Sequence, residues 1–266
     1  MWASIWLLAL PLLGCGGTPP DRPPLALEQA ATLDKRAHAA VRARQYPLAR
    51  DLYGRLLRLR QSIEDLPGIA TATINLASVE HLLGDDVASV RLLDAVLADP
   101  AGLFPDDIKA EAAFRRGVIA IGAGDRTAAT SALLRARGLC ASPCPRDAGL
   151  LNLEGRLALA EGDPQKALAA AGRAGTAAGL DREESANARR ITARALAASG
   201  RLDEALAAYR LVLEEDKDLA DARPISDDLD AIAELLVRMG RKEEADGYRQ
   251  RAATVRAAIP LQEGRP

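Results

Sequence analysis

A glycine recurs at almost constant spacing along most of this chain, and this spacing constrains the fold more than any other feature. Each of these glycines follows the previous one after 38 to 40 residues. The recurring positions are Gly84, Gly124, Gly162, Gly200 and Gly240. A small residue stands seven positions before each, and Ala or Ser stands five positions after each. Ala37, Arg44 and Ala49 repeat this spacing once more near the start. A period of this length predicts stacked copies of one supersecondary unit.

Each unit reads as two antiparallel helices. A small residue on the first helix lets the second pack closely, the glycine ends the first helix in the left-handed conformation, and Ala on the second helix fills the crossing. No segment alternates apolar and polar residues over a length that predicts a strand. We therefore expect an all-α chain of about six antiparallel helix pairs over residues 27–259.

Two stretches show the repeat unit most clearly, "LNLEGRLALAEGDPQKALAAAGRA" and "ITARALAASGRLDEALAAYRLVLEED". Both resemble the tetratricopeptide repeat, which places Gly or Ala at position eight, Gly at fifteen, Ala at twenty and an aromatic residue at twenty-four. Tyr53 and Tyr209 match the aromatic position. The family's Trp is absent, and the period exceeds the usual ~34 residues. The resemblance implies an α-solenoid whose first helices line a concave groove.

The N-terminal residues have the pattern of a targeting segment. Its apolar run, Ile5 to Leu13, is far shorter than the roughly 20 residues that a membrane-spanning helix needs. Small residues follow it, as in a signal peptide over residues 1–14. Leu12-Leu13-Gly14-Cys15 resembles the lipobox of bacterial lipoproteins, which implies acylation of Cys15. Gly16 after the cysteine implies the periplasmic face of the outer membrane. We expect residues 15–26 to form a Pro-rich tether and 260–266 a flexible tail.

No motif in the chain predicts catalysis. The sequence has two histidines, His38 and His81, without His-Glu-x-x-His spacing, and it lacks a phosphate-binding Gly-rich loop and a G-x-S-x-G motif. The formal charge of −2 does not indicate nucleic-acid binding. We therefore expect no enzyme and no cofactor, and we interpret both histidines as solvated groove residues rather than metal ligands.

Cys140 and Cys144 lie in the connection "GLCASPCPRD". With Cys15 acylated, these two remain to pair, and an oxidising periplasm favours a disulfide. Free thiols and a metal or redox role are the alternatives.

By family resemblance, fixed positions of each first helix face the groove. The candidate partner-binding residues are Phe114, Asn152, Arg156, Asn187, Arg190 and Arg194. One interpretation is that the three arginines grip a carboxylate or an acidic peptide, because guanidinium forks suit carboxylates. The alternative is that Arg190 pairs with Asp230 and Arg194 with Glu234, which closes the last unit.

Together these features predict a lipid-anchored periplasmic adaptor that binds envelope proteins or peptides. The alternative function is capture of a small apolar molecule near Phe114, Val118 and Ile121. An open groove with exposed arginines favours the adaptor, whereas a closed apolar channel favours capture.

Overall fold

The computed structural model describes residues 24–219 and 222–258, which form twelve helices and no strand. The predicted all-α fold of six helix pairs is confirmed. In chain order the helices are α1 (Leu25–Arg42), α2 (Tyr46–Ser62), α3 (Leu66–Leu82), α4 (Asp86–Ala98), α5 (Asp106–Gly122), α6 (Arg126–Leu139), α7 (Asp147–Glu161), α8 (Pro164–Ala174), α9 (Arg182–Ala198), α10 (Leu202–Leu219), α11 (Ala222–Arg238) and α12 (Lys242–Ala258).

The predicted signal peptide, Cys15, most of the tether and the tail 260–266 lie outside the described residues. Residues 25–26, which we assigned to the tether, already belong to α1.

The recurring glycines form the turns within the helix pairs, as predicted. All five have left-handed φ values between 76° and 84°. Arg44 takes the same role between α1 and α2, with a φ of 57°. After three of the glycines comes an aspartate that the repeat pattern did not include. Asp85, Asp125 and Asp163 accept hydrogen bonds from backbone amides three residues later and so cap the second helices.

Alanine substitutions at Gly124 and Gly122 test this account of the turn, because they should change the free energy of unfolding in opposite directions. Gly124→Ala should lower the free energy of unfolding by about 1–2 kcal/mol, because φ there is 78° and an L-residue is strained in this region. Gly122→Ala should raise it by about 0.5–1 kcal/mol, because Gly122 is the last residue of α5, has no left-handed φ, and a Cβ there meets no atom within 4 Å. Urea denaturation measures both. A shift of the same sign in the two variants would contradict this account of the turn.

The small residues before the glycines allow close packing between neighbouring units. A Cβ on Gly117 in α5 would lie 2.6 Å from Leu153 Cδ2 in α7. A Cβ on Gly155 in α7 would lie 2.9 Å from Ile191 Cγ2 in α9. The Ala positions after the turns are fully buried. In the second unit Ser89 replaces Ala, and its hydroxyl donates a 2.6 Å hydrogen bond to the carbonyl of Ala77.

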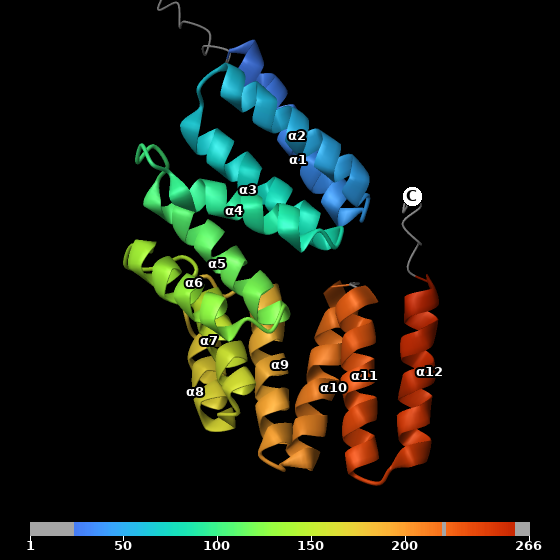
Figure 1. Cartoon of the computed structure of the whole chain (residues 1–266). Helices are drawn as coiled ribbons and strands as arrows, with labels where there is room; N and C mark the ends of the chain where they lie inside the picture. Colours follow the sequence, from blue (N-terminus) through green and yellow to red (C-terminus); the bar gives the residue numbers. More distant parts are fainter. Residues whose placement is uncertain (1–23, 220–221, 259–266) are drawn as a thin grey trace, which may run out of the picture.

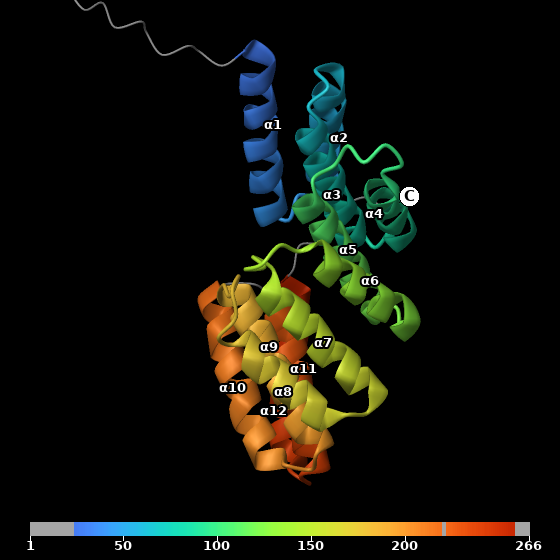
Figure 2. The same cartoon turned by 90° about the vertical axis from the view of Figure 1, so that its left-hand side faces the viewer.

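The pairs stack into a curved array. Figures 1 and 2 show α1–α4 in one part of the molecule and α7–α12 in the other, with α5 and α6 between them. Along the array α3 contacts α5, α5 contacts α7, and α7 contacts α9, so these first helices line one continuous side. Within the described ranges, no helix is both long and apolar enough to cross a membrane.

Candidate functional site

A groove of about 1010 Å³ lies on the side formed by the first helices. Its walls come from the α1–α2 turn, α3, α5, α7 and the start of α9. Phe114 and Val118 of α5 and Leu82 of α3 contribute apolar surface. The charged lining residues are Arg42, Arg44, Arg115, Arg156, Glu183 and Glu184. The groove therefore combines an apolar surface with basic and acidic groups.

Four of the six predicted partner-binding residues line this groove: Phe114, Asn152, Arg156 and Asn187. Asn152 also has a structural role, because its Nδ2 donates to the Glu184 backbone carbonyl at 2.9 Å and to Glu184 Oε2 at 2.7 Å. Asn152 is 3% exposed, and these bonds join α7 to the first turn of α9. Arg190 and Arg194 do not line the groove.

Arg190 lies in a buried network instead. Its Nε donates to Asp228 Oδ1 at 2.9 Å, its Nη1 donates to Asn187 Oδ1 at 3.0 Å, and its Nη2 donates to Asp216. The predicted pairing with Asp230 is wrong, because Asp228 is on the buried face of α11 and Asp230 pairs with Arg256 of α12. Arg190 is therefore occupied by side chains of its own chain.

Arg194 is exposed on α9. Both it and Glu234 are described, and no ion pair joins them within 4 Å, so this predicted pairing is also wrong. Arg194 acts at longer range, because its positive charge contributes to lowering the pKa of Arg156.

Arg156 is half-buried in the groove and makes no direct ion pair there. No carboxylate of the described chain lies within ion-pair distance of it. Burial lowers the pKa of Arg156, as does nearby Arg194, and Glu184 opposes them. An arginine side chain keeps its charge in proteins. The groove thus contains a partly desolvated positive charge one helical turn beyond Asn152, close to the apolar surface of Phe114 and Val118.

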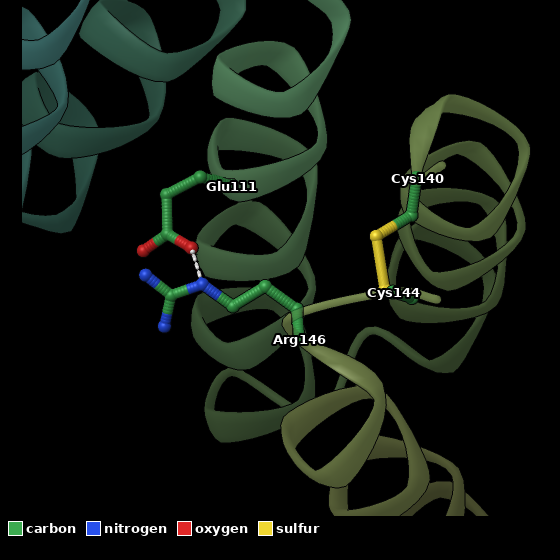
Figure 3. The surroundings of a disulfide bond; sticks show 4 residues. All are labelled: Glu111, Cys140, Cys144 and Arg146. Carbon is green, nitrogen blue, oxygen red and sulfur yellow. Dashed lines mark ion pairs between the residues drawn. A yellow bond between two sulfur atoms is a disulfide. The ribbon is translucent and has the colours of Figure 1, made fainter. Parts of the chain in front are cut away.

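Arg115 is positioned by a chain of contacts that ends near the two cysteines. Figure 3 shows the last part of this chain, from Glu111 and Arg146 to Cys140 and Cys144. Arg115 Nε donates to Glu111 Oε1 at 2.6 Å, and its Nη1 donates to Ser78 Oγ of α3 at 2.8 Å. The second Glu111 oxygen pairs with Arg146 Nε at 2.5 Å. Arg146 follows the loop that the Cys140–Cys144 disulfide closes, with an S–S distance of 2.09 Å. The loop between α6 and α7 therefore supports a side chain of the groove.

The histidines have ordinary side-chain partners. His38 Nδ1 lies 3.1 Å from the Tyr53 hydroxyl, and the two rings meet edge to face. His81 lines the groove and pairs with Asp86 at 2.5 Å. Across residues 24–219 and 222–258, no three His, Cys, Asp or Glu side chains are grouped so that they could hold a metal ion.

Sequence reasoning missed the contribution of the α1–α2 turn to the groove. Arg42, Arg44 and Tyr46 come from the first unit, yet they line the same groove as Glu183 and Glu184 of the fifth. The curvature of the array brings these units together. A repeat pattern defines each unit and its neighbours, but not this curvature.

Solved structures share the fold at low sequence identity. A chain of the APC/C hetero-tetramer Cut9–Hcn1 superposes with a TM-score of 0.66 at 16% identity over 87% of this chain. A Rap protein complexed with Competence and Sporulation Factor gives 0.63 at 16% identity over 86%. The chain spans 41% and 66% of these two proteins. BtubC from P. vanneervenii gives 0.51 at 16% identity, covering 92% of this chain and 96% of BtubC.

A search of curated proteins finds no match. The family model of the tetratricopeptide repeat matches residues 35–108 and 152–220, which together make up more than half of the sequence. These segments contain the turns at Gly84, Gly162 and Gly200 and the buried aromatic residues Tyr53 and Tyr209. The chain therefore belongs to the tetratricopeptide repeat family.

Proposed function

We propose that this chain is a protein-binding adaptor whose groove holds an extended segment of a partner, with a carboxylate at Arg156 and an apolar side chain against Phe114 and Val118. Tetratricopeptide arrays are generally non-catalytic and typical of protein-binding adaptors. The observation that carries the proposal is the half-buried guanidinium of Arg156 inside the groove, which makes no ion pair within 4 Å with any carboxylate of the described residues. An anionic partner would supply the direct ion pair that the described residues do not.

The lining favours this function over capture of a small apolar molecule. Capture predicts a closed channel of apolar side chains around Phe114, Val118 and Ile121. Ile121 does not line the groove, whereas four arginines and two glutamates do. A polypeptide segment can satisfy both the charged groups and the apolar surface. The Rap protein of similar fold was solved in complex with a factor, which agrees with use of this architecture for binding.

Two matched fluorescent peptides test the site. In one, Glu and Leu alternate with Gly and Ser spacers, and in the other Lys replaces Glu. The acidic peptide should bind more tightly by fluorescence anisotropy, and Arg156→Gln should weaken it about ten-fold or more, because a hydrogen bond to a charged group contributes about 1.5–3 kcal/mol. Added salt should reduce the difference between the peptides.

Arg189→Gln is the matched control, because Arg189 is an exposed arginine of α9 that does not line the groove. It should leave the affinity unchanged. Equal affinity for the two peptides, or an Arg156→Gln variant that binds as tightly as the original chain, would contradict the proposed site.

We further propose that the adaptor is lipid-anchored through Cys15 at the periplasmic face of the outer membrane. Support for this comes from the short apolar run and from Leu12-Leu13-Gly14-Cys15. A cysteine with more than one acyl chain stays in the membrane without a spanning helix.

Cys15→Ala should therefore move the protein from the membrane fraction to the soluble fraction or leave it as an uncleaved precursor. Cell fractionation after a salt wash, followed by immunoblotting, measures this. Cys140→Ser, in the loop between α6 and α7, should remain in the membrane fraction. A Cys15→Ala variant that still fractionates with the membrane would overturn the anchor.

A further inference from the structure

The first and last helix pairs of the array meet beside the groove. Tyr46 is the first residue of α2, and Arg223 lies in the first turn of α11. The Arg223 guanidinium carbon is 5.7 Å from the centroid of the Tyr46 ring, a cation–π contact. Figure 1 shows the α1–α2 turn facing the adjacent ends of α10 and α11. Because Tyr46 also lines the groove, the start of α11 lies against one of its walls.

Two buried carboxylates, one on α10 and one on α11, share one cation on α9, and this network attaches α11 to the two helices before it. Asp216 of α10 and Asp228 of α11 are 2% and 1% exposed, and Arg190 of α9 binds both. Asp228 Oδ2 is buried without a hydrogen-bond partner. If both carboxylates are ionised, one negative charge in this cluster has no counter-ion. Asn187 connects the cluster to the groove, because it lines the groove and accepts a hydrogen bond from Arg190.

The groups around Asp228 come from three helices. Arg190 of α9 and Asp216 of α10 act on it directly, and the buried Tyr209 of α10 interacts with its charge. On α12, Arg256 pairs with Asp230 of α11.

Burial raises the pKa of Asp228 to about 7, with Asp216 adding to the effect and Arg190 opposing it. An unfolded aspartate titrates near ~3.9. A carboxyl whose pKa is raised by folding contributes stability that is fully present below the unfolded value and is lost as the pH rises through the folded value. The attachment of α11 should therefore weaken as the pH rises from ~3.9 to about 7 and should change little above that.

We propose that Asp216, Arg190 and Asp228 form a pH-responsive clasp that controls one side of the groove. With Asp228 protonated, α11 packs on α9 and α10 and holds Arg223 against Tyr46. With Asp228 ionised, the start of α11 loosens and Arg223 leaves Tyr46. The effect on partner binding rests on the proposed function, whereas the movement of α11 does not.

Hydrogen exchange with mass spectrometry on the full chain, without any ligand, tests the movement. Exchange is compared between about pH 6 and pH 8.5, with α5 as an internal reference that cancels the intrinsic pH dependence. The protection of α11 relative to α5 should fall by up to about ten-fold at the higher pH, the limit for one group with a pKa of about 7. Asp228→Asn should abolish this fall, because the amide cannot ionise.

Asp230→Asn is the matched control on the same helix and should keep the fall. If Asp228→Asn does not fold, Asp216→Asn decides, because it leaves Arg190 one carboxylate and should also abolish the fall. The clasp is overturned if the protection of α11 in the original chain is the same at both pH values. It is also overturned if the protection falls as much in Asp228→Asn as in the original chain.

The acidic peptide tests the control of the groove. Its association rate should change between the two pH values in the original chain and stay constant in Asp228→Asn. The variant retains His81, so a pH effect shared by both proteins does not come from the clasp. Loosening of α11 without a change in the association rate overturns control of the groove. If the peptide binds at neither pH, the proposed function fails, while hydrogen exchange still decides whether the clasp exists.

Discussion

Arg190→Met is expected to lower the free energy of unfolding at pH 8 by about 3–5 kcal/mol, because it leaves buried charge without a partner. Arg190 is the cation that binds both Asp216 and Asp228, and each of these carboxylates is at most 2% exposed. The loss should be smaller at pH 5. Arg190 lowers the pKa of Asp228, so removal of Arg190 favours the protonated form of Asp228, which carries no charge that needs a partner. Urea denaturation followed by circular dichroism at the two pH values measures both.

Arg189→Met is the neighbouring control. Arg189 pairs with Glu215 at 3.2 Å, but its side chain is 48% exposed, and exposed pairs contribute about 0–1 kcal/mol. Equal losses in the two variants would show that the Arg190 effect is not due to burial. A loss at pH 5 as large as at pH 8 would show that the charge of Asp228 does not cause it.

The repeat pattern predicted the helix pairs because it records local requirements. A left-handed turn needs a residue such as Gly162, and close helix crossings need residues such as Gly117 and Gly155. These constraints act within one unit or between neighbours, so they appear in the sequence at a constant spacing. Asp85, Asp125 and Asp163 could have been included, since each follows its glycine directly and caps the next helix.

The candidate site was less accessible to the same reasoning. Phe114, Asn152, Arg156 and Asn187 were predicted from the resemblance to the tetratricopeptide repeat, and all four line the groove. The partner of Arg190 did not follow, because Asp228 and Asp230 are both acidic residues of α11 and only their burial distinguishes them. The contact between Arg223 and Tyr46 joins the sixth unit to the first and depends on the curvature of the whole array.

Tyr53→Ala is expected to lower the free energy of unfolding by about 3–5 kcal/mol, as for other large aromatic residues removed from a core. Tyr53 occupies the aromatic position of the first repeat and is 2% exposed among side chains of α1, α2 and α3. Tyr53→Phe keeps the ring and loses the hydrogen bond to His38, so it should cost only about 0.5–1.5 kcal/mol. Tyr248→Ala, in the last helix, should cost much less than Tyr53→Ala because that ring is half-buried. Urea denaturation ranks the three.

The position in the array at which Tyr53→Ala loses stability is a stricter test than the size of the loss. In a repeat array each unit contacts mainly its neighbours, so a defect in the first unit should propagate only weakly to distant ones. In Tyr53→Ala, hydrogen exchange should therefore accelerate in α1, α2 and α3 while α7 and α8 keep their protection. The contact of Arg223 with Tyr46 adds one path to the far end, because loosening of α2 removes a partner of α11. Faster exchange at the start of α11 but not in α8 would show that this contact couples the two ends. Uniform acceleration through all the helices would contradict this account, because it would mean that the array unfolds as one cooperative unit.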